Sequence, residues 1–407
     1  MDRSGSRCPS TLVIAVLSIL IVSCGNPSGH RLERFETEGV RTVRTSGGPK
    51  YDTPLLELES DLLLGVDEGE PTWQMFTRTP SLLVAPDGRL VLVDTRAFNI
   101  FIVSRDGKLL HQLGGKGAGP GEFENILEAF WAEKGREFWL TDQFTNRITR
   151  FSIDGEYLGA INYSEIRATW YRFWHLGPRT FMTEGQESNF DETGSATMRY
   201  AVMNDQLEIT RELFSLEGLT YFRMSEYGRS PVPWSSISHP DVTPGGQIVL
   251  VQPDFPRLTV YSSTAESLLH IERDWELDPV TQEEKQNHRQ ITRERYPDAA
   301  VGTIQYPDHK PPFRSVEVDT EGRIWLRMYE TLREEGTDEE PGAFIGYPYE
   351  IYSPEGVWLG THVNRRIIRA IENGYLYQTF LSDAGAPRLE RLRIVPLVRE
   401  LRSEDGG

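Results

Sequence analysis

The sequence predicts an all-β fold, a six-bladed β-propeller closed by an N-terminal strand, with a short helical insertion between blades four and five. Three observations predict it: an internal repeat, six recurrences of one alternating strand, and tight turns between them. GRLVLVDTRAFNIFIVSRDGKLLHQLG begins at Gly88, and the similar REFWLTDQFTNRITRFSIDGEYLGAI begins 48 residues later at Arg136. A period of about 40–50 residues with several short strands per unit is typical of propeller blades.

The alternating strand that marks each blade has the period of two expected of half-buried antiparallel strands. It occurs at Arg89–Val93, Glu137–Thr141, Arg179–Thr183, Gln247–Val251, Arg323–Arg327 and Gly374–Gln378. A partner strand follows each one, at Asn99–Val103, Arg147–Phe151, Arg199–Met203, Arg257–Tyr261, Tyr349–Tyr352 and Arg388–Ile394. Turns such as Asp106-Gly107 and Asp154-Gly155 separate the strands. The propeller is therefore expected to span residues 37–400, with a C-terminal tail at 401–407.

Ring closure is expected to involve the N-terminal segment. After Arg388–Ile394 the chain reads VPLVRELRSEDGG and shows no outer strand for the sixth blade. Gly39–Ser46 alternates like a strand but precedes the first blade. We expect this segment to complete blade six, which would leave no open edge between blades.

Three spacings are longer than a blade requires. Phe214–Pro240 is rich in tyrosine, proline and tryptophan, and Leu332–Tyr347 is acidic and predicts a solvated hairpin loop. Trp275–Pro312 contains a predicted helix in the stretch VTQEEKQNHRQITRERY. Thr281 and Glu284 form a capping-box pattern at its start, and basic residues lie near its end. We expect the helix to lie over a rim of the propeller, and insertions on one face to shape a binding surface.

The first 23 residues are expected to be a signal peptide. Arg3 and Arg7 precede a twelve-residue apolar run, Thr11–Val22, which is too short to span a bilayer. The next residues, Ile21-Val22-Ser23-Cys24, resemble the lipobox of bacterial lipoproteins. This resemblance implies cleavage before Cys24 and lipid attachment to its thiol. The alternative is that Cys24 ends an ordinary secretory signal or a tail anchor.

The lipoprotein interpretation explains the cysteine usage. The chain has two cysteines; one leaves with the leader and the other is lipidated, so no thiol remains to oxidise. Residues 24–36 would then be the lipidated N-terminus and its tether. The resemblance implies an exported protein of the bacterial cell envelope, on the periplasmic side of the outer membrane or at the cell surface. The membrane would be its partner through the lipid anchor.

Charge excludes nucleic acid as a partner. The formal net charge is −18, and the leader carries two arginines against one aspartate, so the remaining chain is at −19. Such a surface repels nucleic acid and anionic headgroups. We expect a monomer whose other partner is an envelope protein or a glycan.

One stretch resembles a known repeat. HQLGGKGAGPGEFENI, from His111, is similar to the opening of an NHL repeat, and the residues Asp142, Asn146, Arg147, Ile148 and Phe151 are similar to its second half. The first unit departs from this pattern, with Ile100 in place of the arginine. The chain as a whole resembles bacterial six-bladed propeller lipoproteins related to NHL-repeat proteins. This resemblance implies the fold and the cellular location, but no particular activity.

Several patterns that could carry chemistry have simpler explanations. Gly114–Gly121 lacks the serine or threonine of a phosphate-binding loop and is expected to connect two blades. Asp94 and Asp142, with Asn99 and Asn146, could ligate a metal, but recurring aspartates of this kind usually cap the turn between strands. No HxH, HExxH, GxSxG or CxxC pattern occurs, so the sequence assigns no metal ligand and no catalytic residue.

Ligands of propellers usually meet the entrance where the innermost strands begin. The residues expected there are Arg78, Glu128, Arg172, His239, Arg314 and Arg369. The arginines would favour a carboxylate or phosphate ligand, unless they pair with neighbouring carboxylates and stabilise the rim. The leading hypothesis is a binding or scaffolding module for a protein, a glycan or a small anionic ligand. The alternative is a lactonase- or lyase-like enzyme with a divalent metal in the central channel, since some NHL-type lyases use histidines from separate blades.

Overall fold

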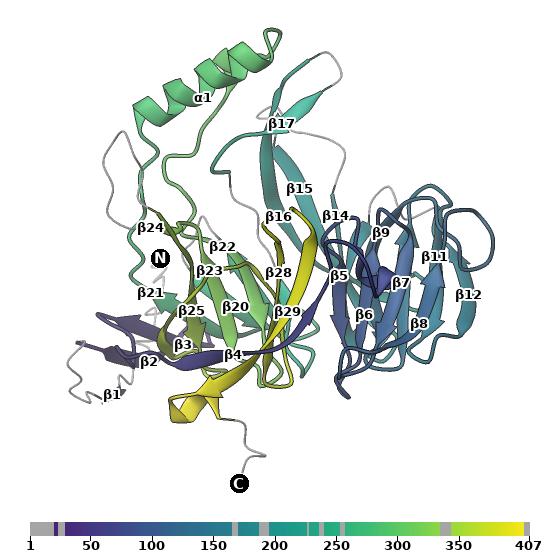
Figure 1. Cartoon of the computed structure of the whole chain (residues 1–407). Helices are drawn as coiled ribbons and strands as arrows, with labels where there is room; N and C mark the ends of the chain where they lie inside the picture. Colours follow the sequence, from purple (N-terminus) through teal and green to yellow (C-terminus); the bar gives the residue numbers. More distant parts are fainter. Residues whose placement is uncertain are drawn as a thin grey trace, which may run out of the picture.

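The computed structural model describes residues 20–22, 29–164, 170–186, 195–225, 228–235, 240–252, 257–333 and 343–402. The strands form six sheets, one for each blade (Figure 1). The innermost strands contact one another in chain order, and the last of them contacts the first, so the sheets form a ring. The predicted all-β, six-bladed propeller is confirmed.

Each blade is a meander that runs outward from the central channel. Blades one and two comprise β5 (Ser81–Val84), β6 (Leu90–Asp94), β7 (Asn99–Val103) and β8 (Leu109–Gly114), then β9 (Ile126–Glu133), β10 (Glu137–Asp142), β11 (Arg147–Ser152) and β12 (Tyr157–Asn162). Blades three and four comprise β13 (Trp170–Gly177), β14 (Thr180–Gln186), β15 (Ser195–Asn204) and β16 (Ile209–Arg223), then β18 (Asp241–Val242), β19 (Ile248–Gln252), β20 (Arg257–Tyr261) and β21 (Ser267–Arg273).

Blades five and six complete the ring. Blade five comprises β22 (Phe313–Val318), β23 (Ile324–Met328), β25 (Phe344–Tyr352) and β26 (Trp358–Asn364), with the short β24 (Leu332–Arg333) paired to β25. Blade six comprises β27 (Ile368–Glu372), β28 (Tyr375–Leu381), β29 (Pro387–Pro396) and β4 (Leu56–Leu64). All six predicted alternating strands and their six partners lie in these blades.

The hydrophobic core lies between adjacent blades rather than in the channel. Val91 of blade one packs in one cluster with Phe138 of blade two, and Phe130 of blade two stacks on Phe173 of blade three at 4.6 Å between ring centroids. Apolar side chains that alternate with polar ones along each strand thus fill the space between neighbouring sheets.

The strand that closes the ring is not the one predicted. β4 is the outermost strand of blade six and pairs antiparallel with β29 along its whole length. Gly39–Ser46, predicted for this position, instead contains β3 (Val40–Ser46), which pairs in parallel with β21 of blade four. Both segments alternate, so alternation does not distinguish them. The distinction comes from connectivity, because β4 directly precedes blade one and so leads from an outermost strand to the next innermost strand, β5, as β8 leads to β9.

The N-terminal segment widens the sheet of blade four. β2 (Arg31–Thr37) pairs antiparallel with β3, and β1 (Leu20–Val22) pairs with β2. β1 lies within the predicted leader, whereas the predicted lipid-attachment residue, Cys24, lies outside the described residues. No helix in the described ranges is long and apolar enough to span a bilayer.

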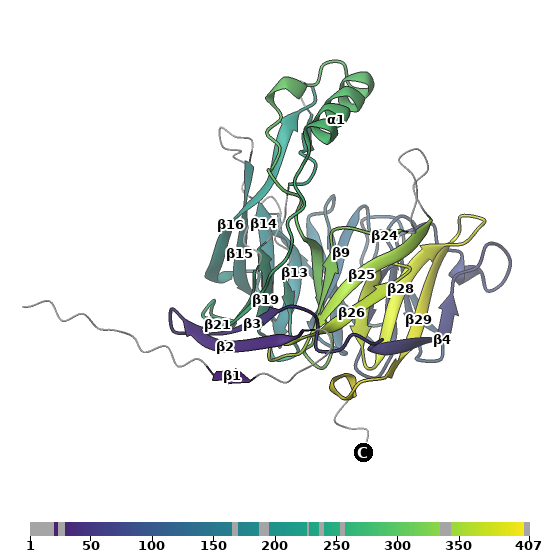
Figure 2. The same ribbon diagram turned by 90° about the vertical axis from the view of Figure 1, so that its left-hand side faces the viewer.

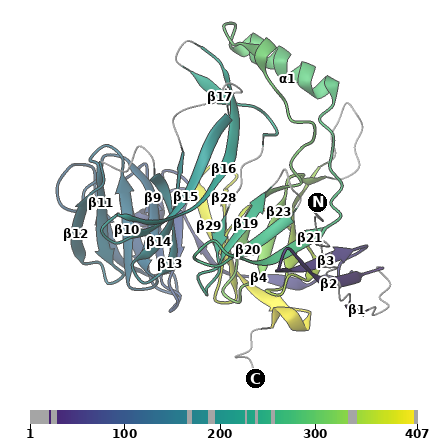
Figure 3. The same cartoon turned by 180° about the vertical axis from the view of Figure 1, so that it is seen from behind.

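The insertions before blades four and five form a projecting arm. We define the arm as the end of β16 that pairs with β17 (Tyr221 to Arg223), together with β17 (Arg229–Pro231), α1 (Gln282–Arg295) and η2 (Val301–Thr303). α1 has the predicted capping box between Thr281 and Glu284. It contacts η2, and the arm has a small core that includes Phe222 and Ile304. The helix lies over one rim of the propeller, as expected, but the arm holds it above the blades, as Figures 2 and 3 show.

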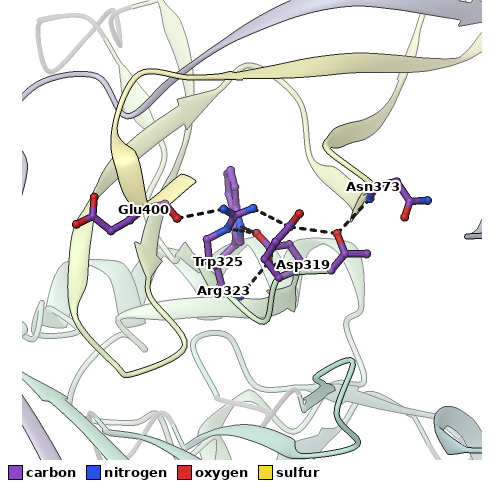
Figure 4. Close-up of polar contacts among 7 residues, drawn as sticks. Asp319, Arg323, Trp325, Asn373 and Glu400 are labelled. Atoms are coloured by element: carbon purple, nitrogen blue, oxygen red, sulfur yellow. Dashed lines mark hydrogen bonds and ion pairs between the residues drawn. The ribbon is translucent and has the colours of Figure 1, made fainter. Parts of the chain in front are cut away.

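A polar network joins blades five and six at the end of the channel opposite the arm (Figure 4). The Asp319 carboxylate accepts hydrogen bonds from Arg323 Nε (2.6 Å) and Trp325 Nε1 (3.1 Å), and both ionic side chains are buried. Arg323 Nη1 donates to the backbone oxygen of Glu400 in η3 (Arg399–Leu401), and the Asn373 backbone N–H donates to Thr320 Oγ1. The turn after β22 is thereby tied to blade six and to the C-terminal turn.

Candidate functional site

The entrance is the end of the channel at which the innermost strands begin. The arm rises from this end, because both of its insertions connect an outermost strand to the next innermost strand. The residues predicted for the entrance are Arg78 before β5, Glu128 in β9, Arg172 in β13, Arg314 in β22 and Arg369 in β27. His239 lies outside the described residues. The other five residues lie in three places: two in one hollow, two in a second hollow, and Arg314 outside both.

Two of the predicted arginines share one hollow. Arg78 and Arg369 line a cavity of about 970 Å³ between blades six, one and two. Both side chains are exposed, and neither makes an ion pair within the part of the chain that the structure describes. Arg369 Nε donates only to the Thr379 hydroxyl, at 2.9 Å. Two guanidinium groups therefore face one hollow with most of their donors available to a ligand.

A second hollow of about 590 Å³ contains Glu128 and Arg172. Ser81 and Leu127 line both hollows, so the two are neighbours across a shared wall. Arg172 lies 3.9 Å from the buried carboxylate of Glu184, measured between Nε and Oε1. Arg172 therefore pairs with a neighbouring carboxylate, as the alternative raised in the sequence analysis expects, although the distance is long for an ion pair.

Glu128 has an unusual environment for a carboxyl group. It accepts a hydrogen bond from the Phe173 backbone N–H, whereas its Oε2 is buried and has no hydrogen-bond partner among the described residues. Burial raises the pKa of Glu128 to about 8, although the nearby Arg172 guanidinium opposes the rise. At neutral pH the side chain is therefore mostly a neutral acid, which can both donate and accept hydrogen bonds.

Arg314 lies apart from both hollows. Its guanidinium lies over the ring of Tyr329, 4.1 Å from the centroid, and it lines neither cavity. It makes no ion pair with a described residue. The structure thus brings together Arg78, Arg369, Glu128 and Arg172, and leaves Arg314 at another part of the same end.

The deeper channel contains acidic residues that sequence reasoning missed. Lys134 Nζ, at the end of β9, binds the Glu372 carboxylate of blade six at 2.8 and 3.0 Å. Burial raises the pKa of Glu317 to about 7 and of Asp241 to about 6. Glu317 and Glu372 each lie three residues after an entrance arginine on an innermost strand, and this offset is the signal that could have identified them.

These buried carboxyls predict that stability falls as pH rises. Unfolded, Glu128 and Glu317 lose their protons near pH 4.5; folded, they keep them until about pH 8 and 7. The folded state therefore holds more protons between these values, and stability decreases across this window at about 1.4 kcal/mol per pH unit for each fully differing group. Glu128→Gln should raise the melting temperature relative to wild type at pH 8 and leave it unchanged at pH 4.5.

The matched control for this pH experiment is Glu124→Gln, because Glu124 is an exposed carboxyl on the approach to β9. It should leave the difference from wild type constant from pH 4.5 to pH 8. The measurement is a series of thermal melts for the three proteins across that range. A Glu128→Gln curve that runs parallel to wild type would show that Glu128 titrates normally.

The recurring aspartates cap turns, as predicted. The Asp94 carboxylate accepts from Thr77 Oγ1 at 2.6 Å and from the Ala97 backbone N–H at 3.2 Å. Asp142 accepts from the backbone N–H groups of Glu124 (2.8 Å) and Phe144 (3.0 Å). Each aspartate thus binds the turn after its own strand and the segment that enters its own blade. Gly114–Gly121 is the predicted connection, from β8 to β9.

The histidines are dispersed. His270 contacts Thr259 in blade four, His288 contacts Tyr306 in the arm, and burial lowers the pKa of His362 in blade five to about 4. Within the described ranges, no three histidine, cysteine, aspartate or glutamate side chains are grouped so that they could hold a metal ion.

Comparisons with known proteins agree on the fold. A family model described as a 6-bladed beta-propeller matches residues 74–226, which span blades one to three. A protein from Bacteroides fragilis that is named as exported has a similar structure (TM-score 0.52, 12% identity, 86% of this chain and 99% of that chain). So has a member of a family of unknown function from Bacteroides vulgatus (TM-score 0.50, 10% identity, 84% and 99%).

Other comparisons add nothing to the functional argument. A virginiamycin B lyase from Staphylococcus aureus aligns less well (TM-score 0.43, 9% identity, 84% of this chain and 100% of that chain). At this similarity it supports no statement about the chemistry of this chain. The comparison with curated proteins finds no match.

Proposed function

We propose that this chain is an exported, lipid-anchored propeller that binds an anionic ligand at its entrance as a non-catalytic module. The observation that carries the proposal is the hollow with Arg78 and Arg369, two guanidinium groups that form no ion pair with a described residue. In a chain of net charge −18, such arginines are unexpected unless an anion is their partner.

The rim interpretation, in which these arginines stabilise the propeller, is supported at only one position. Arg172 does approach a carboxylate, that of Glu184. Arg78 and Arg369 form no ion pair with a described residue, although 61 acidic residues were available to the chain, and Arg369 interacts only at longer range with the buried carboxyl of Glu317. Exposed ion pairs contribute little to stability in any case, so two unpaired arginines in one cavity are better explained by ligand binding.

The ligand proposal predicts that Arg78→Gln/Arg369→Gln binds anions more weakly. Citrate and pyrophosphate are suitable probes, measured by titration calorimetry on the full chain in detergent. Each charge-assisted hydrogen bond is worth about 1.5–3 kcal/mol, so the double variant should lose at least tenfold in affinity. Arg314→Gln removes one positive charge from the same end outside the hollow, and its matched counterpart is the single variant Arg78→Gln, which removes one charge inside it. Equal losses in both single variants would indicate only a general charge effect.

Export and anchoring rest on the residues Ile21-Val22-Ser23-Cys24, with support from the exported name of the Bacteroides fragilis protein. Two or three acyl chains hold a protein on a membrane, since each buried CH₂ contributes about 0.8 kcal/mol. Cys24→Ala should therefore move the protein from the membrane fraction to the soluble fraction. Intact-mass measurement of the wild type should show lipid on a chain that begins at Cys24, and a free thiol there would contradict the anchor.

A further inference from the structure

The two entrance hollows adjoin each other. They share Ser81 and Leu127, and their volumes of about 970 and 590 Å³ lie within or near the range that holds small ligands. One hollow contributes Arg78 and Arg369, and the other contributes Arg172 and Glu128. A ligand that fills both must therefore be longer than a single small anion and must extend across the shared wall.

Neutral hydroxyl groups line the first hollow beside the arginines. Thr79, Ser81 and Thr95 contribute side-chain hydroxyls that form no hydrogen bond with another described residue. The shared wall is amphipathic, because Leu127 keeps 45% of its surface exposed next to Ser81. This combination matches a pyranose ring, which has hydroxyls at its edge and C–H groups on its face.

The second hollow adds a group that selects for a hydroxyl. Glu128 lines this hollow, and its Oε2 is buried and has no hydrogen-bond partner among the described residues. A buried polar atom without a partner is costly, and a ligand that supplies a hydrogen bond removes this cost. A ligand without a hydroxyl or amide at this point would leave the cost in place, which is the physical basis of discrimination.

We propose that the entrance takes an acidic oligosaccharide, with a carboxylate of one uronate unit on Arg78 and Arg369 and a hydroxyl of a neighbouring unit on Glu128. This inference rests on the proposed function and names its ligand class. An acidic peptide would satisfy the arginines as well. Its backbone amides can reach Glu128, but a peptide offers one N–H and one C=O per residue beside Thr79, Ser81 and Thr95, whereas a pyranose ring offers several hydroxyls, and for this reason the structure favours the sugar.

The test compares ligands of equal charge. Hexamers of galacturonate, mannuronate and glucuronate are titrated into the full chain in detergent, beside their carboxyl-reduced neutral forms and hexaglutamate. At least one uronate hexamer should bind at least tenfold more tightly than its neutral form and than hexaglutamate. Arg78→Gln/Arg369→Gln should remove the preference over the neutral form, and Arg314→Gln should preserve it.

Two further variants test the hydroxyl contacts. Glu128→Leu should weaken uronate binding at least fivefold and hexaglutamate binding less. Ser81→Ala is a small change at an exposed residue. It should weaken uronate binding by a smaller factor and leave hexaglutamate binding unchanged, and it provides the test if Glu128→Leu does not fold. Uronate binding that neither variant affects would overturn the inference.

The outcomes separate this inference from the proposed function. If hexaglutamate binds as tightly as every uronate and Arg78→Gln/Arg369→Gln weakens both, the site binds anions and the sugar assignment is wrong. If no anionic probe distinguishes Arg78→Gln/Arg369→Gln from wild type, both proposals are wrong.

Discussion

A chain that begins at Gly65 should lose its cooperative thermal transition, whereas a chain that begins at Gly48 should keep it. The first variant removes β1 to β4, including the strand that completes blade six, and the second removes only β1 to β3. Without β4, the outer edge of β29 is left unpaired, and blade six is no longer joined to the N-terminal segment.

The expected effect of removing β4 is large because its ends are buried. Leu55, Leu56 and Leu64 expose 2%, 4% and 2% of their surfaces. Fully burying a leucine contributes about 1.5–3 kcal/mol, so the three together contribute roughly 5–9 kcal/mol before the lost strand pairing is counted. This is comparable to the whole stability of a typical domain, about 5–15 kcal/mol.

The shorter truncation is the control, since it removes the other three N-terminal strands, β1 to β3, and keeps β4. It exposes the β21 edge and removes Val43 from a core cluster, which should lower the melting temperature without abolishing the transition. Calorimetry of both variants measures the difference, and a synthetic peptide of residues 49–66 added to the Gly65 chain should restore a transition. If the Gly48 chain is the one that fails to fold, β3 contributes more to closure than its position indicates.

The position of the closing strand, β4, could not be predicted from the sequence repeat. The blades could be predicted because each is a local unit of about 40–50 residues whose strands pair with their sequence neighbours. β4 pairs with a strand more than 300 residues away, and Leu56–Leu64 alternates no more clearly than Val40–Ser46. Only the rule that the strand preceding blade one completes the last blade would have distinguished the two.

The sequence predicted which residues lie at the entrance, but not how their side chains are arranged. Blade position predicted that Arg78 and Arg369 lie at the entrance, because the start of an innermost strand can be found from the repeat. That these two share a hollow while Arg314 lies over Tyr329 depends on side-chain packing between blades, which the repeat does not encode. The buried carboxyls of Glu317 and Asp241 could not be separated by type from 61 acidic residues.

The second large effect is expected at the opposite end of the channel, where Asp319→Asn should lower the melting temperature by several degrees. The Asp319 carboxylate is fully buried and accepts four hydrogen bonds, from Arg323 Nε, Trp325 Nε1 and the backbone N–H groups of Glu321 and Arg323. An asparagine has the same shape but no charge, so Arg323 loses its buried counterion. Removing one partner of such a pair costs about 3–5 kcal/mol.

Blade one provides a matched control at the same turn. Asp87 and Arg89 occupy the positions of Glu321 and Arg323, and Asp87 binds Arg89 Nε at 2.7 Å with half of its side chain exposed. Asp87→Asn should cost at most about 1 kcal/mol, since exposed ion pairs contribute little. Denaturant unfolding of both variants gives the comparison, and similar costs would mean that burial does not strengthen the Asp319 network.

A double variant separates the ion pair from the turn. Asp319→Asn/Arg323→Leu removes both charges of the buried pair, so the guanidinium that kept only the more exposed Glu321 carboxylate is gone, and part of the lost stability should return. The part of the stability that is not recovered measures the contacts that Arg323 makes with Glu400 of the C-terminal turn and with Glu321. Because these contacts join the turn after β22 to the segment that follows β29, a large remainder would show that the network holds blades five and six together. A full recovery would show that it only neutralises its own charges.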